Sequence, residues 1–212
     1  MKCKASSARG SGSGLATFGS PDSAGIPPAL AALTAVLPYN DEQKLERFFK
    51  KNRDLACILV EPIAANMGVV PARKSFLSAL SYWSKKTGAL LIFDEVITGF
   101  RLCYGGAEPW SGVKADITVL GKIIGGGLPV GAFGGSERLM RRLSPEGTVY
   151  QAGTLSGNPL SMAAGISVLS RLDPAFYHAL NRRTEVFVNE LEARLRRKGK
   201  KIAVNRAGSM FT

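Results

Sequence analysis

The sequence has few of the residues that metal sites, disulfide frameworks and hydrolase triads require. Its 212 residues include a single histidine, His178, and three cysteines, Cys3, Cys57 and Cys103, without CxxC spacing. The odd count leads us to expect neither a disulfide nor a bound zinc ion. A nucleophile activated by histidine would have to use His178, which lies in an arginine-rich helical stretch, so we interpret it as a satisfied or exposed helix residue.

Long apolar runs are also missing. The least polar stretch, residues 117–135, is interrupted by Lys122, Pro129 and several glycines, so we expect no transmembrane segment and no membrane partner. The first residues carry charge with no apolar run behind them, so we expect no secretory signal. We therefore expect a cytoplasmic protein, or a plastid protein if the source is a photosynthetic eukaryote.

Acidic residues are scarce, and the formal net charge is +12. Half of this excess is local, because residues 181–206 hold nine basic and three acidic side chains. Phe176 and Leu180 just before this stretch, and Phe187, Leu191 and Leu195 within it, recur at helical spacing, which predicts an amphipathic helix whose charged face is solvated. Without a recognisable nucleic-acid motif, such charge gives only weak, non-specific attraction, and we expect no nucleic-acid partner.

The order of apolar runs and helical patterns predicts an α/β domain. Four buried strands are expected at residues 56–60, 89–93, 117–120 and 130–133, and helices at 74–87, 160–172 and 173–198. Two further strands are expected at residues 202–205 and 210–211. Such alternation indicates a parallel or mixed sheet covered on both faces, in which ligands bind beyond the carboxyl ends of the strands.

Lys122 is the first candidate for chemistry, because it follows a buried strand and precedes two isoleucines and three glycines. Apolar surroundings lower the pKa of an amine, and a neutral amine can form a covalent bond with an aldehyde cofactor. Two other interpretations fail. A phosphate-binding P-loop needs Ser or Thr where Ile123 stands, and Pro129 would break the helix of a dinucleotide fingerprint.

Asp94 is the second candidate, because it follows another buried strand. Alone, it would be interpreted as a cap for a following helix. Paired with Lys122, it could bind the pyridine nitrogen of pyridoxal 5'-phosphate (PLP) and keep that nitrogen protonated, which makes the ring an electron sink.

Three ordered motifs then resemble the signature of the class III aminotransferases, which are PLP-dependent enzymes of fold type I. They are LIFDEVITGFR at residues 91–101, LGKIIGGGLPVGA at 120–132 and YQAGTLSGNP at 150–159. Within the class, EPIAANMGVVP at residues 61–71 and YGGA at 104–107 resemble the aminomutase branch. The similarity runs from about residue 12 to residue 212.

The resemblance implies roles for four residues. Lys122 would bind the cofactor covalently and move protons, and Asp94 would bind the pyridine nitrogen. Asn66 would lie near the phenolic oxygen of the cofactor, and Thr154 would bind the cofactor phosphate of the neighbouring subunit in a homodimer. Glu61 and Arg101 are left outside the catalytic set as members of structural ion pairs, and Ser13 is best interpreted as linker.

The domain organisation implied by the resemblance has three parts. Residues 1–20 would be a loop or poorly ordered segment, 21–172 part of the large PLP-binding domain, and 173–212 the start of a small α+β C-terminal domain. The family's glycine-serine turn for its own phosphate does not appear in this sequence, so we expect this chain alone to bind PLP weakly.

The implied reaction is an intramolecular amino transfer that converts the small-molecule substrate glutamate-1-semialdehyde into 5-aminolevulinate, a precursor of tetrapyrroles such as porphyrins. Two alternatives stay open. One is another class III enzyme, such as an ω-aminotransferase that moves nitrogen between two substrates. The other is a non-catalytic fragment that keeps the fold.

Overall fold

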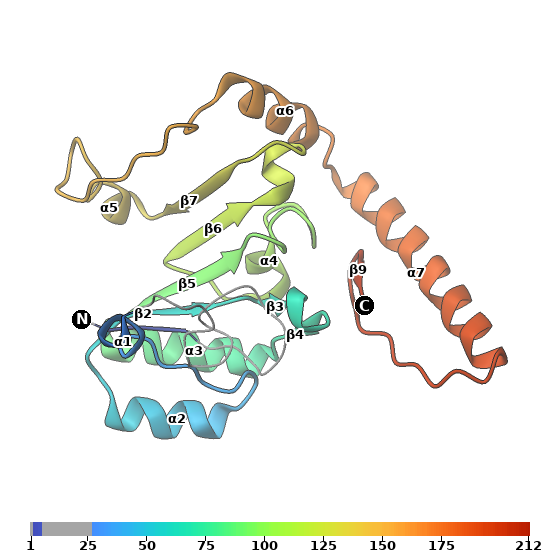
Figure 1. Cartoon of the computed structure of the whole chain (residues 1–212), viewed down its shortest axis with the longest axis horizontal. Coiled ribbons are helices and arrows are strands. Elements are labelled where there is room, and N and C mark those ends of the chain that lie inside the picture. The colour runs from blue at the N-terminus through green and yellow to red at the C-terminus, as the bar shows by residue number, and fades with distance from the viewer. Residues whose placement is uncertain (1, 6–26) are drawn as a thin grey trace.

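The computed structural model describes residues 2–5 and 27–212, and its central feature is a five-stranded sheet (Figure 1). The strand order is β1-β2-β5-β6-β7. The first four strands in that order are parallel, and β7 runs antiparallel to β6. The predicted α/β class, a mostly parallel sheet with flanking helices, is confirmed.

The four strands predicted from apolar runs are present, each with bounds within two residues of the prediction. They are β2 (Leu55–Val60), β5 (Leu90–Glu95), β6 (Ile117–Gly121) and β7 (Gly131–Gly135). The prediction that all four strands are buried was wrong for β7, whose five residues are all exposed. The predicted N-terminal loop was wrong for Lys2–Ala5, which form β1 beside β2. Parallel pairing uses backbone groups, so the sequence KCKA, which has no apolar run, gave no signal of it. The rest of that loop lies outside the described residues.

α3 (Lys74–Thr87) packs on β2 and β5, and α2 (Glu42–Lys51) packs beside α3 (Figure 1). α2 begins at Asp41, whose side chain accepts a hydrogen bond from the Lys44 amide. α3 ends at Gly88, which adopts the left-handed conformation that favours glycine. Their inner faces and the two strands form the core, whose most deeply buried large side chains include Leu45, Phe49, Phe76, Leu77, Leu80 and Phe93.

Short elements connect these parts. Between β2 and α3 lie β3 (Ile63–Ala64), η1 (Ala65–Met67) and β4 (Val70–Pro71), and α1 (Pro28–Ala31) precedes α2. Beyond β5 follow α4 (Ala107–Ser111), η2 (Lys122–Gly125) and α5 (Glu137–Met140).

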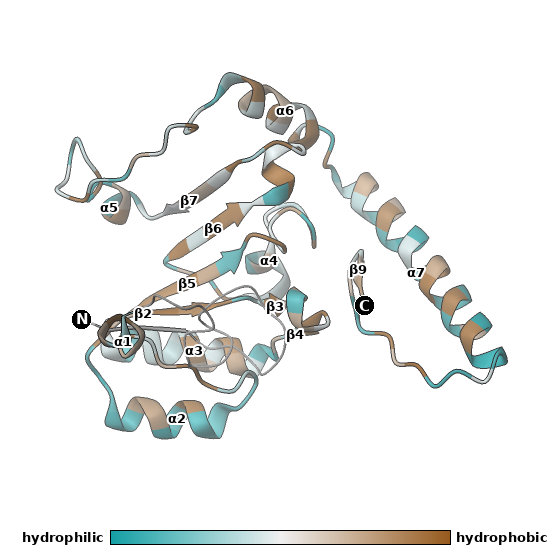
Figure 2. Cartoon of the chain, viewed as in Figure 1, coloured by the Kyte–Doolittle hydropathy of each residue, from teal (hydrophilic) through white to brown (hydrophobic). Residues whose placement is uncertain are grey.

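α6 (Pro159–Leu169) packs against η2 at the far side of the sheet. The packing brings backbones together, because a Cβ on Gly165 would lie 2.3 Å from the Ile124 carbonyl oxygen and one on Gly126 would lie 2.5 Å from that of Ala164. Figure 2 shows hydrophobic residues along the central strands and on α6.

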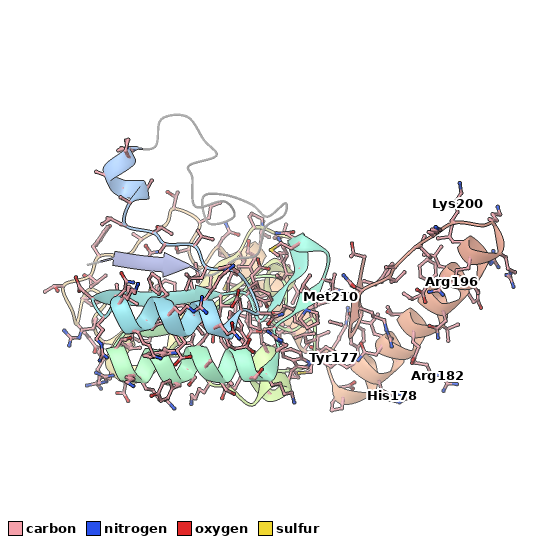
Figure 3. All side chains as sticks on the ribbon, turned by 90° about the horizontal axis from the view of Figure 1, so that it is seen from below. Tyr177, His178, Arg182, Arg196, Lys200 and Met210 are labelled. Atoms are coloured by element: carbon pink, nitrogen blue, oxygen red, sulfur yellow. The ribbon has the colours of Figure 1, made fainter. Side chains whose placement is uncertain are left out.

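α7 (Pro174–Arg197) is the longest helix of the described residues and extends away from the sheet (Figure 1). Its first turn is attached by the Tyr177 hydroxyl, which donates to the Phe100 carbonyl at 2.8 Å. Figure 3 labels Arg182, Arg196 and Lys200 along α7 and its exit, and all three are exposed, as predicted. His178 is exposed too.

Two predictions about α7 and the residues after it were wrong, and a third is not tested by the structure. Phe176 and Phe187 are exposed on α7, although their spacing predicted a buried face, and Tyr177 and Val188 are buried instead. Residues 202–205 form no strand. The hairpin consists of β8 (Arg206–Ala207) and β9 (Met210–Phe211), because the tight turn between them sets the pairing. Nothing in the fold tests the predicted domain boundaries.

The expectation of no disulfide was wrong, because Cys57 is disulfide-bonded. The parallel register of β1 and β2 sets Cys3 opposite Cys57, a proximity that sequence spacing alone does not show. Cys103 is a free thiol that donates to the Gly106 carbonyl at 3.2 Å. Among the described residues, no helix has both the length and the apolar character needed to cross a membrane.

Candidate active site

The candidate site lies where β2, β5 and β6 end at the same edge of the sheet. These strands are parallel, so the residues that follow them meet there. Asp94 is the fifth residue of β5 and is paired in register with Val119 of β6, three residues before Lys122. The structure therefore brings Asp94 and Lys122 to one edge, as their positions after buried strands predicted.

The Lys122 backbone has an unusual conformation. Its φ is 47°, in the left-handed region that residues other than glycine rarely adopt. Lys122 opens η2, and its side chain is exposed, so the expectation that apolar surroundings enclose its amine was wrong for this chain. Such a conformation costs free energy and persists only where its surroundings enforce it. α6 packs closely on the backbone of η2, the segment that Lys122 opens.

Two further residues with positive φ lie near the same edge of the sheet. Val69 has a φ of 49° in the turn after η1, and Phe100 has a φ of 56° in the loop after β5. A β-branched residue such as valine is a clear outlier in this region. Strained backbone concentrates at functional sites, so the clustering supports this edge as the site.

The Asp94 carboxylate is half-buried and accepts one hydrogen bond from the backbone just after its own strand. The Val96 amide donates to its Oδ1 atom at 3.1 Å. This bond orients the carboxylate and leaves its other oxygen for a further donor. Asp94 can therefore hold an N–H group of a ligand, which is what a protonated pyridine offers.

Glu95, the next residue, faces the core and fixes the loop that follows β5. It is 2% exposed, and its Oε2 atom accepts from the Ala107 amide at 2.6 Å and the Thr98 hydroxyl at 3.1 Å. Burial raises the pKa of Glu95 above its ordinary value. Gly106 has a φ of 70°, and a Cβ there would lie 2.3 Å from Glu95 Oε2, so the loop closes tightly on this carboxylate. Sequence reasoning missed this role.

Glu61 lies one residue beyond β2 and is half-buried. Its Oε2 atom accepts from the Ala65 amide at 3.3 Å. Burial is the largest influence and raises the pKa of Glu61; the charge of Asp94 also raises it, and the charge of Lys122 lowers it. The position of Glu61 at a strand end, like that of Asp94, was the sequence signal that could have placed it in the site.

The other two predicted site residues lie on different segments. Asn66 is in η1 with an exposed side chain, five residues after Glu61 on the same edge. Thr154 is exposed in the segment that leads from α5 to α6. Figure 1 shows this segment running past β7, away from β2 and β5.

A cavity of about 970 Å³ lies elsewhere, near the beginning of β6, and is lined in part by Tyr82, Lys114 and Asp116. Neither Asp94 nor Lys122 lines it. Within residues 2–5 and 27–212, no group of three or more His, Cys, Asp or Glu side chains is arranged to hold a metal ion.

Comparison with known proteins identifies the class. The family model "Aminotransferase class-III" matches residues 4–212, so the chain belongs to the class III aminotransferase family. The resemblance predicted from the motifs is confirmed.

Within the family, the chain is similar to aminomutases. It is 53% identical over 203 residues to the glutamate-1-semialdehyde 2,1-aminomutase of Aquifex aeolicus, covering 95% of this chain and 48% of that protein. It is 52% identical to the enzyme of the same name from Pelotomaculum thermopropionicum, covering 94% and 46%. The chain thus spans about half the length of the curated relatives it matches.

Solved structures share the fold. An omega-transaminase from Sphaerobacter thermophilus superposes with a TM-score of 0.90 at 34% identity, covering 99% of this chain and 52% of that one. A glutamate-1-semialdehyde aminomutase from Pseudomonas aeruginosa superposes with a TM-score of 0.79 at 25% identity, covering 98% and 51%.

Proposed function

We propose that the chain is part of a PLP-dependent aminomutase that converts glutamate-1-semialdehyde into 5-aminolevulinate in tetrapyrrole biosynthesis. The observation that carries the proposal is the meeting of Lys122 and Asp94 at one sheet edge, in a chain 53% identical to a named aminomutase. Bacterial relatives support a cytoplasmic location.

The residues at the site fit the cofactor. Asp94 keeps a carboxylate oxygen beyond the one bound by Val96, and Lys122 presents an exposed amine from a backbone held in a strained conformation. We propose that Lys122, Asp94 and Asn66 hold PLP. Relatives in the same fold include one solved with PLP and one with its amine form.

Thr154 would contribute to a second site. Because Thr154 is exposed on a segment directed away from β2 and β5, we propose that it binds the phosphate of PLP in a partner subunit of a homodimer. Asn158, four residues on, caps α6 and so fixes the end of this segment.

When bound, PLP supplies an aldehyde that takes up amino groups and a ring that withdraws electrons. Asp94 keeps a proton on the ring nitrogen, which strengthens that withdrawal. The Lys122 amine accepts and returns the protons that leave the substrate carbons. Substrate and product have the same composition, so the reaction needs no second amino donor or acceptor.

Covalent capture tests the site. The protein is incubated with PLP, reduced with borohydride and digested, and the labelled peptide is located by mass spectrometry. We expect the label on Lys122, and we expect Lys122→Ala to abolish it. Lys114, an exposed lysine just before β6, provides the control, and Lys114→Ala should leave the label in place. Label spread over surface lysines equally in both variants would contradict the proposal and favour a non-catalytic fragment.

A second candidate is an ω-aminotransferase, favoured by the TM-score of 0.90 with the Sphaerobacter thermophilus enzyme. The two are distinguished by product formation. The aminomutase forms 5-aminolevulinate from glutamate-1-semialdehyde alone, whereas the ω-aminotransferase requires an added amino acceptor. A strict requirement for a keto acid would overturn the aminomutase assignment.

A further inference from the structure

Tyr177, in the first turn of α7, holds the β5–α4 loop, residues 96–106. Its hydroxyl donates to the Phe100 carbonyl at 2.8 Å, although the two residues are 77 positions apart in the sequence. Tyr177 is 6% exposed, whereas its neighbour Phe176 is 42% exposed, so this turn of α7 faces the loop with Tyr177. Figure 3 places Tyr177 where α7 meets the rest of the molecule. The start of the C-terminal segment is therefore attached to the loop at a defined atom.

A second contact joins the same elements. Asn181 lies one helical turn after Tyr177, and Gly208 lies in the turn of the β8–β9 hairpin. A Cβ on Gly208 would lie 3.4 Å from Asn181 Oδ1 and 3.7 Å from the Leu102 carbonyl oxygen of the loop. α7, the hairpin and the loop thus pack together. This packing shelters the Tyr177 hydrogen bond from water, and a sheltered hydrogen bond is electrostatically stronger than an exposed one.

The carbonyl that Tyr177 binds belongs to a residue with a strained backbone. Phe100 has a φ of 56°, and such a conformation persists only where surrounding contacts hold it. The amides of Arg101 and Leu102 both donate to the Thr98 carbonyl, at 3.0 and 3.2 Å, and so form a tight turn around Phe100. The hydrogen bond from Tyr177 is one of the contacts that hold this turn. Its loss should let the loop open more often.

The same loop contacts the strand ends that carry both candidate site residues. The Val96 amide donates to Asp94 Oδ1 at 3.1 Å. A Cβ on Gly121, the residue before Lys122, would lie 3.2 Å from Val96 Cγ1. Val96 therefore lies between the end of β5 at Asp94 and the end of β6 that leads into Lys122.

A glycine fits the loop against β6. The Gly99 amide donates to the Glu95 carbonyl at 2.8 Å. A Cβ on Gly99 would overlap the side chain of Leu120, in β6. Because the loop is packed this closely, its movement changes the contacts of both strand ends.

We propose that Tyr177 is a positioning residue that, through the β5–α4 loop, sets the spacing between the Asp94 carboxylate and the Lys122 amine. The proposal rests on the function proposed for Asp94 and Lys122, which must hold one PLP ring between them. Loss of the Tyr177 hydroxyl leaves both side chains in place and lets their separation vary. Lys122 should then still capture PLP, but at a higher PLP concentration, because a site that is less well ordered binds its ligand less tightly.

The first test needs no cofactor. Hydrogen–deuterium exchange followed by mass spectrometry compares the amides of residues 96–106 in Tyr177→Phe and in the control Tyr82→Phe. Tyr82 is 54% exposed, and its hydroxyl accepts from the Lys86 ammonium at 2.9 Å, so the control also loses one hydroxyl and one hydrogen bond. We expect about two- to tenfold faster exchange of the loop in Tyr177→Phe, the usual effect of one hydrogen bond, and no change in the control. Equal exchange in the two variants overturns the proposal.

The second test measures the PLP concentration that gives half-maximal borohydride labelling of Lys122. We expect this concentration to rise about two- to tenfold in Tyr177→Phe and to stay unchanged in Tyr82→Phe. Tyr177→Phe is then combined with Asp94→Ala, which removes one of the two groups that hold the ring. If Tyr177 acts by spacing these groups, it should have little further effect in that background. An equal rise with and without Asp94 would show a merely structural role and overturn the proposal.

The function proposed for Lys122 and the role of Tyr177 fail in different ways. If the unmodified protein does not capture PLP at Lys122, the function of Lys122 is refuted, and the positioning role falls with it. If the unmodified protein captures PLP and Tyr177→Phe matches Tyr82→Phe in both measurements, only the role of Tyr177 is refuted.

Discussion

The two halves of the molecule differ in how completely their apolar residues are covered. In the covered half, formed by β2, β5, α2 and α3, Phe49 is 2% exposed and Phe76 is fully buried at 0%. In the open half, residues 131–169, the apolar side chains of Tyr150, Leu160 and Ile166 are 82%, 74% and 70% exposed. The free energy that stabilises the described fold must therefore come mainly from the covered half.

The candidate site lies on the boundary between these halves. Glu61 and Asp94 leave strands of the covered half, where hydrogen bonds from Ala65 and Val96 fix them. Lys122 begins η2, which packs on α6 of the open half. The carboxylates are thus held by the core, and the position of the amine depends on the less covered side.

The largest expected effect is in the covered core. Phe76→Ala removes a fully buried ring that packs on Tyr39, and we expect it to lower the free energy of unfolding by about 3 to 5 kcal/mol. Phe133→Ala, in β7, removes the same side chain from a position that is 42% exposed and should cost less than about 1 kcal/mol. Urea denaturation followed by circular dichroism measures both. Equal losses of unfolding free energy in the two variants would show that the two halves contribute equally to stability.

The sequence predicted the elements whose pattern is local. Continuous apolar runs located β2, β5, β6 and β7, and the strand-end rule brought Asp94 and Lys122 to one edge. Both signals depend only on residues that are close in sequence, so contacts between distant segments do not change them. The roles assigned to these residues, and to Asn66 and Thr154, stay predictions.

What the sequence did not predict depends on contacts between distant segments. The burial of Glu95 requires the Ala107 amide to close on it, and the disulfide of Cys57 accompanies the pairing of β1 with β2. The exposure of Phe187 likewise depends on what packs against α7. Periodicity identifies an apolar face but not whether another segment covers it.

An effect of intermediate size is expected on the pH dependence of stability. It comes from Glu95, which lies at the boundary between the covered and open halves. Burial raises the pKa of Glu95 above its ordinary 4.5, so the folded protein binds this proton more tightly than the unfolded chain does. Its contribution to stability is complete below pH 4.5 and is lost as pH rises through the raised pKa. The slope is at most about 1.4 kcal/mol per pH unit.

Glu95→Gln has no proton to lose, so we expect the unfolding free energy to fall less steeply with rising pH over that window. Glu137→Gln changes an exposed carboxylate in the open half and should leave the slope as in the unmodified protein. Urea denaturation at several pH values above 4.5 provides the measurement. If Glu95→Gln and Glu137→Gln gave the same slope, Glu95 would not be the source of the pH dependence.

The smallest expected loss of stability comes from removing one helix N-cap in each half. Asp41 caps α2 through the Lys44 amide at 2.9 Å, and Asn158 caps α6 through the amides of Leu160 and Ser161 at 3.1 and 3.3 Å. Loss of either cap costs about 1 kcal/mol of helix stability. Because α2 unfolds with the core, Asp41→Ala should lower the global unfolding free energy by that amount.

Asn158→Ala should behave differently, because α6 has little buried apolar area to couple it to the core. We expect amide exchange in α6 to become about fivefold faster, the equivalent of 1 kcal/mol, while global stability stays nearly constant. Hydrogen–deuterium exchange by mass spectrometry separates the two outcomes. A fall in global stability equal to that of Asp41→Ala would mean that α6 unfolds together with the covered half, and that the boundary through Lys122 is as rigid as the carboxylates it faces.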